Sequence, residues 1–83
     1  MEHNEILKGL KDILVQMDPS KKEMVENVTE DTRLAEDLGL ASVALIYMVV
    51  AIEETFGIEF DDLSIDDFKT VGTTIKYIEN KLG

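Results

Sequence analysis

The apolar residues of the first 17 positions recur at intervals of three or four. The residues that follow this spacing are Ile6, Leu7, Leu10, Ile13, Leu14 and Met17. This spacing places them on one face of an amphipathic helix, and Asn4 is a candidate for its N-cap. The helix has to end near Asp18, because Pro19 follows and a residue before proline avoids helical geometry. The chain therefore opens with a helix that packs by one face on a core.

The length and composition restrict the chain to one small domain, which we expect to span residues 1–83. Of the 83 residues, 45% are hydrophobic, enough for a single compact core. No repeat, low-complexity tract or linker divides the sequence. A domain of this size offers little room for a deep catalytic cleft. The chain has no cysteine, which excludes disulfides, zinc–thiolate sites and a cysteine nucleophile.

A long connection, residues 18–41, leads to a second long helix. We expect a helical turn near residues 20–25, with Val28 and Leu34 attaching the connection to the core. Ser42 is suited to cap the helix that follows, and Gly57 fits just past its end. The residues expected on its buried face are Val43, Ile46, Val49, Val50, Ile52 and Phe56.

The last third of the chain predicts one more helix. Ile58, Phe60 and Leu63 alternate with acids, but an isolated strand would have nothing to pair with. We therefore predict a loop and a short helical turn near residues 61–68. Thr70 or Thr73 can start the final helix, with an inner side formed by Val71, Ile75, Ile78 and Leu82. The predicted fold class is all-α, a small four-helix bundle with one short helix and a long first loop.

The charge is strongly negative and unevenly placed. The formal net charge is −10, which makes nucleic acids and anionic membranes poor partners. Residues 34–68 contain nine acidic residues and no Lys or Arg, so this surface would attract basic partners. A merely solubilising surface is the alternative.

No segment predicts membrane insertion or secretion. The longest apolar run, Val43–Ile52, has ten residues, about half of a membrane span. The first residues lack the basic and apolar regions of a signal peptide. We expect a cytoplasmic monomer without a membrane span.

The residues around Ser42 resemble the phosphopantetheine attachment motif of acyl carrier proteins, approximately Asp-Leu-Gly-x-Asp-Ser-Leu. Asp37, Leu38, Gly39 and Ser42 match this motif at the correct spacing. The resemblance extends through residues 51–59 and 70–78, and so spans nearly the whole chain. It implies the four-helix fold of that family. An ordinary N-cap is the alternative role for Ser42.

The resemblance implies a carrier without catalytic activity. A separate phosphopantetheinyl transferase would move 4′-phosphopantetheine from coenzyme A onto the Ser42 hydroxyl. The arm would hold an acyl or aminoacyl group as a thioester for acyl-loading, acyl-transfer or condensing enzymes of fatty-acid, polyketide or related biosynthesis. The residues themselves agree, because an anion is favoured at a helix start. The only histidine, His3, lies far from Ser42 in the sequence, so no base is at hand to activate the serine.

Two departures from the motif concern partners. Ala41 replaces the usual Asp and Val43 the usual Leu, and the following turns lack the acids of bacterial fatty-acid carriers. One helix face cannot bury every side chain from Val43 to Ile52, so some of Ala44, Leu45, Tyr47 and Ala51 should form an outward apolar patch. We expect partners with apolar or basic surfaces to contact Asp37, Leu40, Ala41, Val43, Ala44, Tyr47, Glu53, Glu54 and Glu59.

An interaction module and an enzyme are the two alternatives to a carrier. The same bundle could serve as an unmodified acidic protein-interaction module, and the departure at Ala41 keeps this alternative open. An enzyme has little support, because no carboxylate cluster combines with a base or a phosphate loop. Asp61, Asp62, Asp66 and Asp67 lack the spacing of a calcium-binding loop, so we predict no dedicated metal site.

Overall fold

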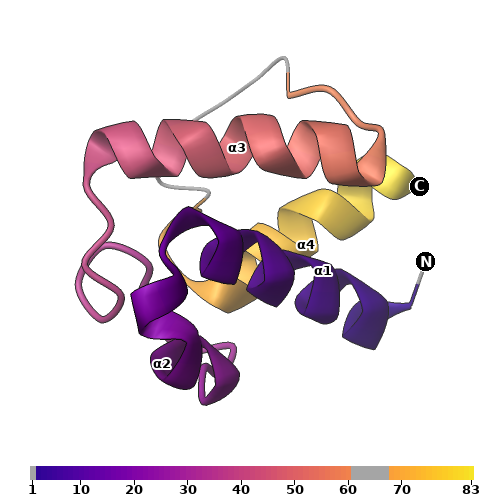
Figure 1. The fold of residues 1–83 in the computed structure, drawn as a ribbon. Coiled ribbons are helices and arrows are strands. Elements are labelled where there is room, and N and C mark those ends of the chain that lie inside the picture. The colour runs from indigo at the N-terminus through magenta and orange to yellow at the C-terminus, as the bar shows by residue number, and fades with distance from the viewer. Residues whose placement is uncertain (1, 61–67) are drawn as a thin grey trace.

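The computed structural model describes residues 2–60 and 68–83. Within these ranges the elements are α1 (His3–Met17), the 3-10 helix η1 (Pro19–Lys21), α2 (Lys22–Glu26), α3 (Ser42–Phe56) and α4 (Val71–Leu82) (Figure 1). The described ranges contain an isolated bridge between Arg33 and Thr70 but no strand. The predicted all-α bundle, with one short helix and a long first loop, is confirmed. The helical turn expected near residues 61–68 falls almost entirely outside the described residues.

Helix α1 is the centre of the bundle. It packs against α2, α3 and α4, and Figure 1 shows α3 passing over it. Its buried residues are Ile6, Leu10, Ile13 and Leu14, as the periodicity predicts. The predicted cap at Asn4 is wrong, because the helix begins earlier, at His3, with Glu2 as N-cap and no side-chain cap. The predicted end at Asp18 is confirmed.

The long connection is held to the start of α4 by backbone hydrogen bonds. Leu34 N–H donates to Lys69 O (3.0 Å), and Val71 N–H donates to Thr32 O (2.9 Å). Gly72 N–H donates to Glu30 O (2.9 Å), and a Cβ at position 72 would lie only 3.0 Å from that oxygen. Val28 and Leu34 are buried, as expected. These bonds hold residues 30–34 of the connection against the bundle, shortly before the chain enters α3.

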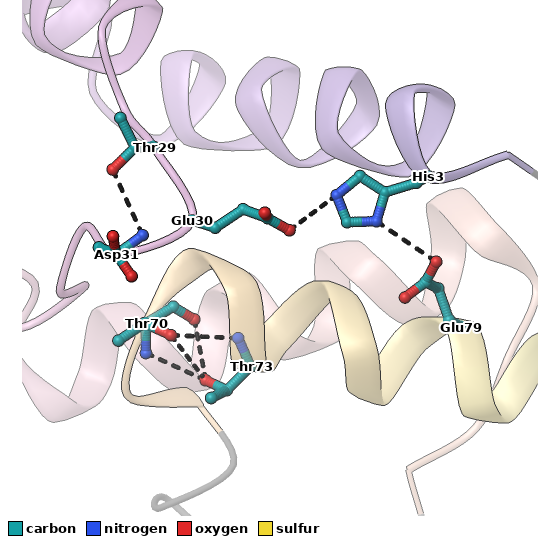
Figure 2. A network of polar contacts seen from close by, with 7 residues as sticks. All are labelled: His3, Thr29, Glu30, Asp31, Thr70, Thr73 and Glu79. Carbon is teal, nitrogen blue, oxygen red and sulfur yellow. Dashed lines mark hydrogen bonds and ion pairs between the residues drawn. The ribbon is translucent and has the colours of Figure 1, made fainter.

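Polar side chains add a second attachment between the same elements. His3 lies between two carboxylates, with Nε2 2.8 Å from Glu30 Oε1 and Nδ1 3.4 Å from Glu79 Oε2 (Figure 2). The three side chains come from the start of α1, the long connection and α4. All three are partly exposed, so these contacts contribute little free energy of folding.

Helix α4 begins with a reciprocal cap. Thr70 Oγ1 accepts from Thr73 N–H (3.1 Å), and Thr73 Oγ1 accepts from Thr70 N–H (3.1 Å) (Figure 2). Of the two predicted starts, Thr70 and Thr73, the structure has Thr70 as the N-cap. The inner side is also as predicted, with Val71, Ile75 and Ile78 buried and Leu82 partly buried. Among the described residues, no helix has the length and apolar character needed to cross a membrane.

Candidate functional site

The loop that leads to Ser42 is held by an ion pair within it. Asp37 Oδ1 lies 3.1 Å from Arg33 Nη2, and Asp37 Oδ2 accepts from the Arg33 backbone N–H at 2.8 Å. Asp37 N–H in turn donates to Arg33 O (2.9 Å), and Glu36 pairs with the same guanidinium. The hydrogen bond from the Arg33 side chain, helped by that from its backbone, holds the pKa of Asp37 below its ordinary value. Asp37 therefore fixes the shape of the loop.

A turn at Gly39 follows this ion pair. Gly39 has φ +70°, a left-handed conformation that favours glycine. Leu38 is buried on one side of the turn, and Leu40 N–H donates to Leu34 O (3.2 Å) on the other. Lys21 reaches the turn from η1, and its Nζ donates to Leu38 O at 2.6 Å. The sequence gives no signal for this Lys21 contact, which depends on how η1 is placed beside the loop.

Ser42 is the first residue of α3 and is exposed. The N-cap is Ala41, so the predicted capping role of Ser42 is wrong by one position. Ala41 has no side-chain acceptor, and the first described backbone bond of α3 is from Leu45 N–H to Ala41 O (3.0 Å). The N–H groups of Ser42, Val43 and Ala44 precede that bond. The helix start thus combines an exposed hydroxyl with backbone donors that no N-cap side chain occupies.

The outward face of α3 is apolar. Four large side chains are exposed at helical spacing: Val43 (79%), Ile46 (58%), Tyr47 (63%) and Val50 (48%). We call these four residues the α3 stripe. An outward apolar patch beside Ser42 was expected, and Val43 and Tyr47 were among the residues assigned to partners. Four exposed side chains in one row on a small protein are typical of an interaction site.

The rotation of α3 differs from the predicted one. Its buried residues are Leu45, Met48, Val49, Ile52 and Phe56. Val43, Ile46 and Val50 were predicted to be buried and are exposed, whereas Leu45 was a candidate for the outward patch and is buried. Ala44 and Ala51 are partly buried. The predicted C-terminus is correct, because Gly57 follows the helix with φ +67°.

The other residues assigned to partners are not equivalent. Ala41, Glu54 and Glu59 are exposed, and Leu40 is partly buried against the core. The Glu53 carboxylate accepts a hydrogen bond from Phe60 N–H at 2.9 Å, so it holds the chain that follows α3. Asp61, Asp62, Asp66 and Asp67 lie outside the described residues. Glu54 lies on the same helix as the α3 stripe, four residues after Val50, the last residue of the stripe.

A shallow groove lies beside the first turn of α3. Its volume is about 280 Å³, and its lining is mainly apolar, with Leu45 and Phe68 as the largest apolar side chains. Arg33 and Lys69 also line it. Phe68 forms an aromatic cluster with Phe60 and Tyr77, with ring centroids 5.0–5.7 Å apart. The groove reaches α3 at Leu45, three residues after Ser42 in the sequence.

Comparison with known proteins gives a family for this arrangement. A family model described as "Phosphopantetheine attachment site" matches residues 22–78. The match includes the loop, Ser42, all of α3 and most of α4.

Individual relatives agree with the family match. The acyl carrier protein of Thermotoga maritima is 43% identical over 56 residues, which cover 68% of this chain and 69% of that protein. The acyl carrier protein of Sulfurovum sp. is 44% identical over 55 residues, covering 66% of this chain and 73% of that protein. The mitochondrial acyl carrier protein of Saccharomyces cerevisiae is 42% identical over 53 residues, covering 64% of this chain and 42% of that protein.

Proposed function

Because the chain belongs to the phosphopantetheine-bearing acyl carrier protein family, we propose that Ser42 is the residue that carries its 4′-phosphopantetheine arm. The protein is a carrier, not an enzyme. The observation that carries the proposal for Ser42 is its place at the first position of α3, exposed and without a side-chain cap before it.

The start of α3 is chemically suited to a phosphodiester. Its free N–H groups and the positive end of the helix dipole both favour an anion. Gly39 and Ala41, the small residues near Ser42, leave the approach to the hydroxyl open. The arm's terminal thiol supplies the chemistry, since it holds an acyl group as a thioester. The chain's own part is to present the hydroxyl and, afterwards, the modified helix start.

The chain does not activate Ser42 itself. Its only histidine, His3, contacts Glu30 and Glu79 and is therefore engaged away from Ser42. A serine nucleophile needs an adjacent base, so that base has to come from the transferase. In the transfer, Ser42 Oγ forms the new bond to the phosphorus of phosphopantetheine and gives its proton to that base. The pyrophosphate bond of coenzyme A breaks, and adenosine 3′,5′-bisphosphate leaves.

Intact-mass measurement tests the carrier function. The protein is incubated with coenzyme A and a broad-specificity phosphopantetheinyl transferase. We expect a gain of one phosphopantetheinyl group in the wild type and none in Ser42→Ala, with Ser20→Ala modified like the wild type. If several transferases leave the wild type unchanged, the unmodified interaction module is the better description.

We propose further that enzymes of acyl loading and transfer dock on the α3 stripe. From Ser42 to Ile52 the helix carries no charge, and exposed acids follow at Glu54 and Glu59. This pattern fits a partner with an apolar groove beside a basic rim. A second copy of the chain fits poorly, because each copy carries a net charge of −10. We place these reactions in the cytoplasm and the carrier in monomeric form.

The substitution Tyr47→Glu tests this docking surface. Thr55→Glu is the matched control, since it adds the same charge at an exposed position of the same helix outside the stripe. Measured with an acyl-loading or acyl-transfer enzyme as partner, KM for Tyr47→Glu should rise at least about tenfold, because one large apolar contact is worth about 1.5–3 kcal/mol. The increase should persist at high salt. Equal KM values for the two variants would show that the stripe is not the docking surface.

We propose that the groove lined by Leu45 and Phe68 binds the apolar acyl chain held on the arm. Its lining matches the chemistry of a short acyl chain. Binding there would shield the cargo between visits to partner enzymes. A longer lifetime of the thioester on the wild type than on Leu45→Asp would support this placement, and equal lifetimes would count against it.

A further inference from the structure

Lys21 makes a contact that the carrier function does not by itself require. Its Nζ donates to Leu38 O at 2.6 Å, across 17 residues of sequence. The side chain is only 30% exposed, less than the exposed surface lysines around it. A Cβ placed on Gly39 would lie 3.5 Å from the same Nζ. The ammonium group is therefore seated against the turn formed by Leu38 and Gly39.

The other charged group near this ammonium does not account for its position. Asp18 Oδ2 lies 4.0 Å from Lys21 Nζ and is itself partly exposed. The carboxylate of Asp18 instead accepts from Ser20, whose hydroxyl is the leading cause of the lowered pKa of Asp18. The short, charge-assisted bond of Lys21 is thus directed to the backbone of the loop.

The turn that Lys21 contacts, at Leu38 and Gly39, lies shortly before Ser42 in the loop. Gly39 has the conformational freedom of glycine and a left-handed φ of +70°. The Arg33–Asp37 pair holds the loop before the turn, and α3 holds the chain after it. At the turn itself, Leu38 is buried and its carbonyl oxygen is held by Lys21. Losing that bond would free the turn and, with it, the entry angle of α3.

We propose that Lys21 is a positioning residue for the modification of Ser42. This inference rests on the proposed function. Its ammonium group holds the Leu38–Gly39 turn in the one arrangement that presents the Ser42 hydroxyl to a transferase. It touches neither the hydroxyl nor the transferred group, and acts through the backbone of residues 38–41.

Steady-state kinetics of modification test the inference with two matched variants. Lys21→Met keeps the length of the side chain but removes the ammonium group. Lys22→Met removes the same charge from the adjacent residue, which faces the groove between α1 and α2. A less populated competent loop lowers the apparent affinity in proportion. We expect KM to rise about tenfold for Lys21→Met, with kcat little changed, and no such rise for Lys22→Met. Lys21→Arg, which can still donate to Leu38 O, should recover most of the loss.

Hydrogen exchange gives a second measurement that does not depend on the transferase. Leu40 N–H bonds to Leu34 O beyond the turn, so its exchange should be faster in Lys21→Met. The amides of α1 should exchange as in the wild type. This pattern would separate local loosening of the loop from a general loss of stability.

The outcomes distinguish the two levels of the proposal. If the wild type is modified but Lys21→Met and Lys22→Met have equal KM values and equal Leu40 protection, the role of Lys21 is refuted and the carrier function stands. If no transferase modifies the wild type, the carrier function and the role of Lys21 fail together. A raised KM with faster Leu40 exchange in Lys21→Met alone supports the inference.

Discussion

The first backbone N–H groups of α3 and of α4 have no partner within their own helix, but only the start of α4 is capped by side chains. Thr70 and Thr73 close the start of α4, each side chain bonding to the other residue's backbone N–H. Ala41 offers no such acceptor at the start of α3, where Ser42 is exposed. Both starts are connected to the same region, in which residues 30–34 form backbone hydrogen bonds with residues 69–72. The comparison indicates that the α4 start contributes to stability, whereas the α3 start remains available to a ligand.

The largest expected difference is in stability when each start is altered. Thr70→Ala removes the acceptor for Thr73 N–H and should lower the free energy of unfolding by about 1–2 kcal/mol. For a domain of this size the melting temperature should fall by about 4–8 °C per kcal/mol. Ser42→Ala should change the free energy of unfolding by less than about 0.5 kcal/mol, because Ser42 caps nothing. Urea unfolding followed by far-UV circular dichroism measures both, and equal losses would break the comparison.

A smaller effect is expected from closing the open start. Ala41 has φ −77° and ψ 169°, an extended geometry suited to an N-cap. Ala41→Ser should therefore raise the free energy of unfolding by about 0.5–1 kcal/mol. Ala35→Ser, at an exposed loop position, is the control and should have little effect.

Modification should reduce the effect of that added cap. The phosphodiester and the hydroxyl introduced by Ala41→Ser would use the same N–H groups, so the stabilisation by this substitution should be smaller in the modified protein than in the unmodified one. The four unfolding free energies form a double-mutant cycle. Strict additivity would mean that the phosphodiester does not use the donors at the start of α3.

The smallest expected effect concerns acid. Hydrogen bonds from Arg33 lower the pKa of Asp37 in the folded protein. The resulting stabilisation is fully present above the unfolded pKa of about 3.9 and is lost as pH falls through the folded pKa. In Asp37→Asn the melting temperature should decrease less steeply between about pH 5 and pH 2 than in the wild type. Parallel curves would show that the Arg33–Asp37 pair contributes nothing to the stability of the loop.

The predictability of the two long helices from sequence differs for a physical reason. In α1 the apolar residues alternate with polar ones, so Ile6, Leu10 and Ile13 reveal the buried face directly. In α3 every residue from Val43 to Ile52 is apolar, and such a run contains no information on rotation. The buried face was therefore misplaced, and Val43, Ile46 and Val50 turned out to be exposed.

The site was predictable only in part. The motif and the position of Ser42 near a helix start follow from local sequence. Whether Ser42 is the N-cap or the first helical residue depends on a shift of one position, which local sequence determines poorly. The contact between Lys21 and Leu38 O and the bonds between residues 30–34 and 69–72 require the folded arrangement. They connect segments far apart in the chain, and no periodicity or motif encodes them.

The location of the modification in the wild-type chain tests the central role of Ser42 most directly. After incubation with coenzyme A and a transferase, the protein is digested and its peptides are fragmented by tandem mass spectrometry. The chain has three serines, Ser20, Ser42 and Ser64. We expect one phosphopantetheinyl group, with fragment ions that place it on Ser42. A group on Ser20, on Ser64 or on any other residue would contradict the proposed attachment at the open start of α3.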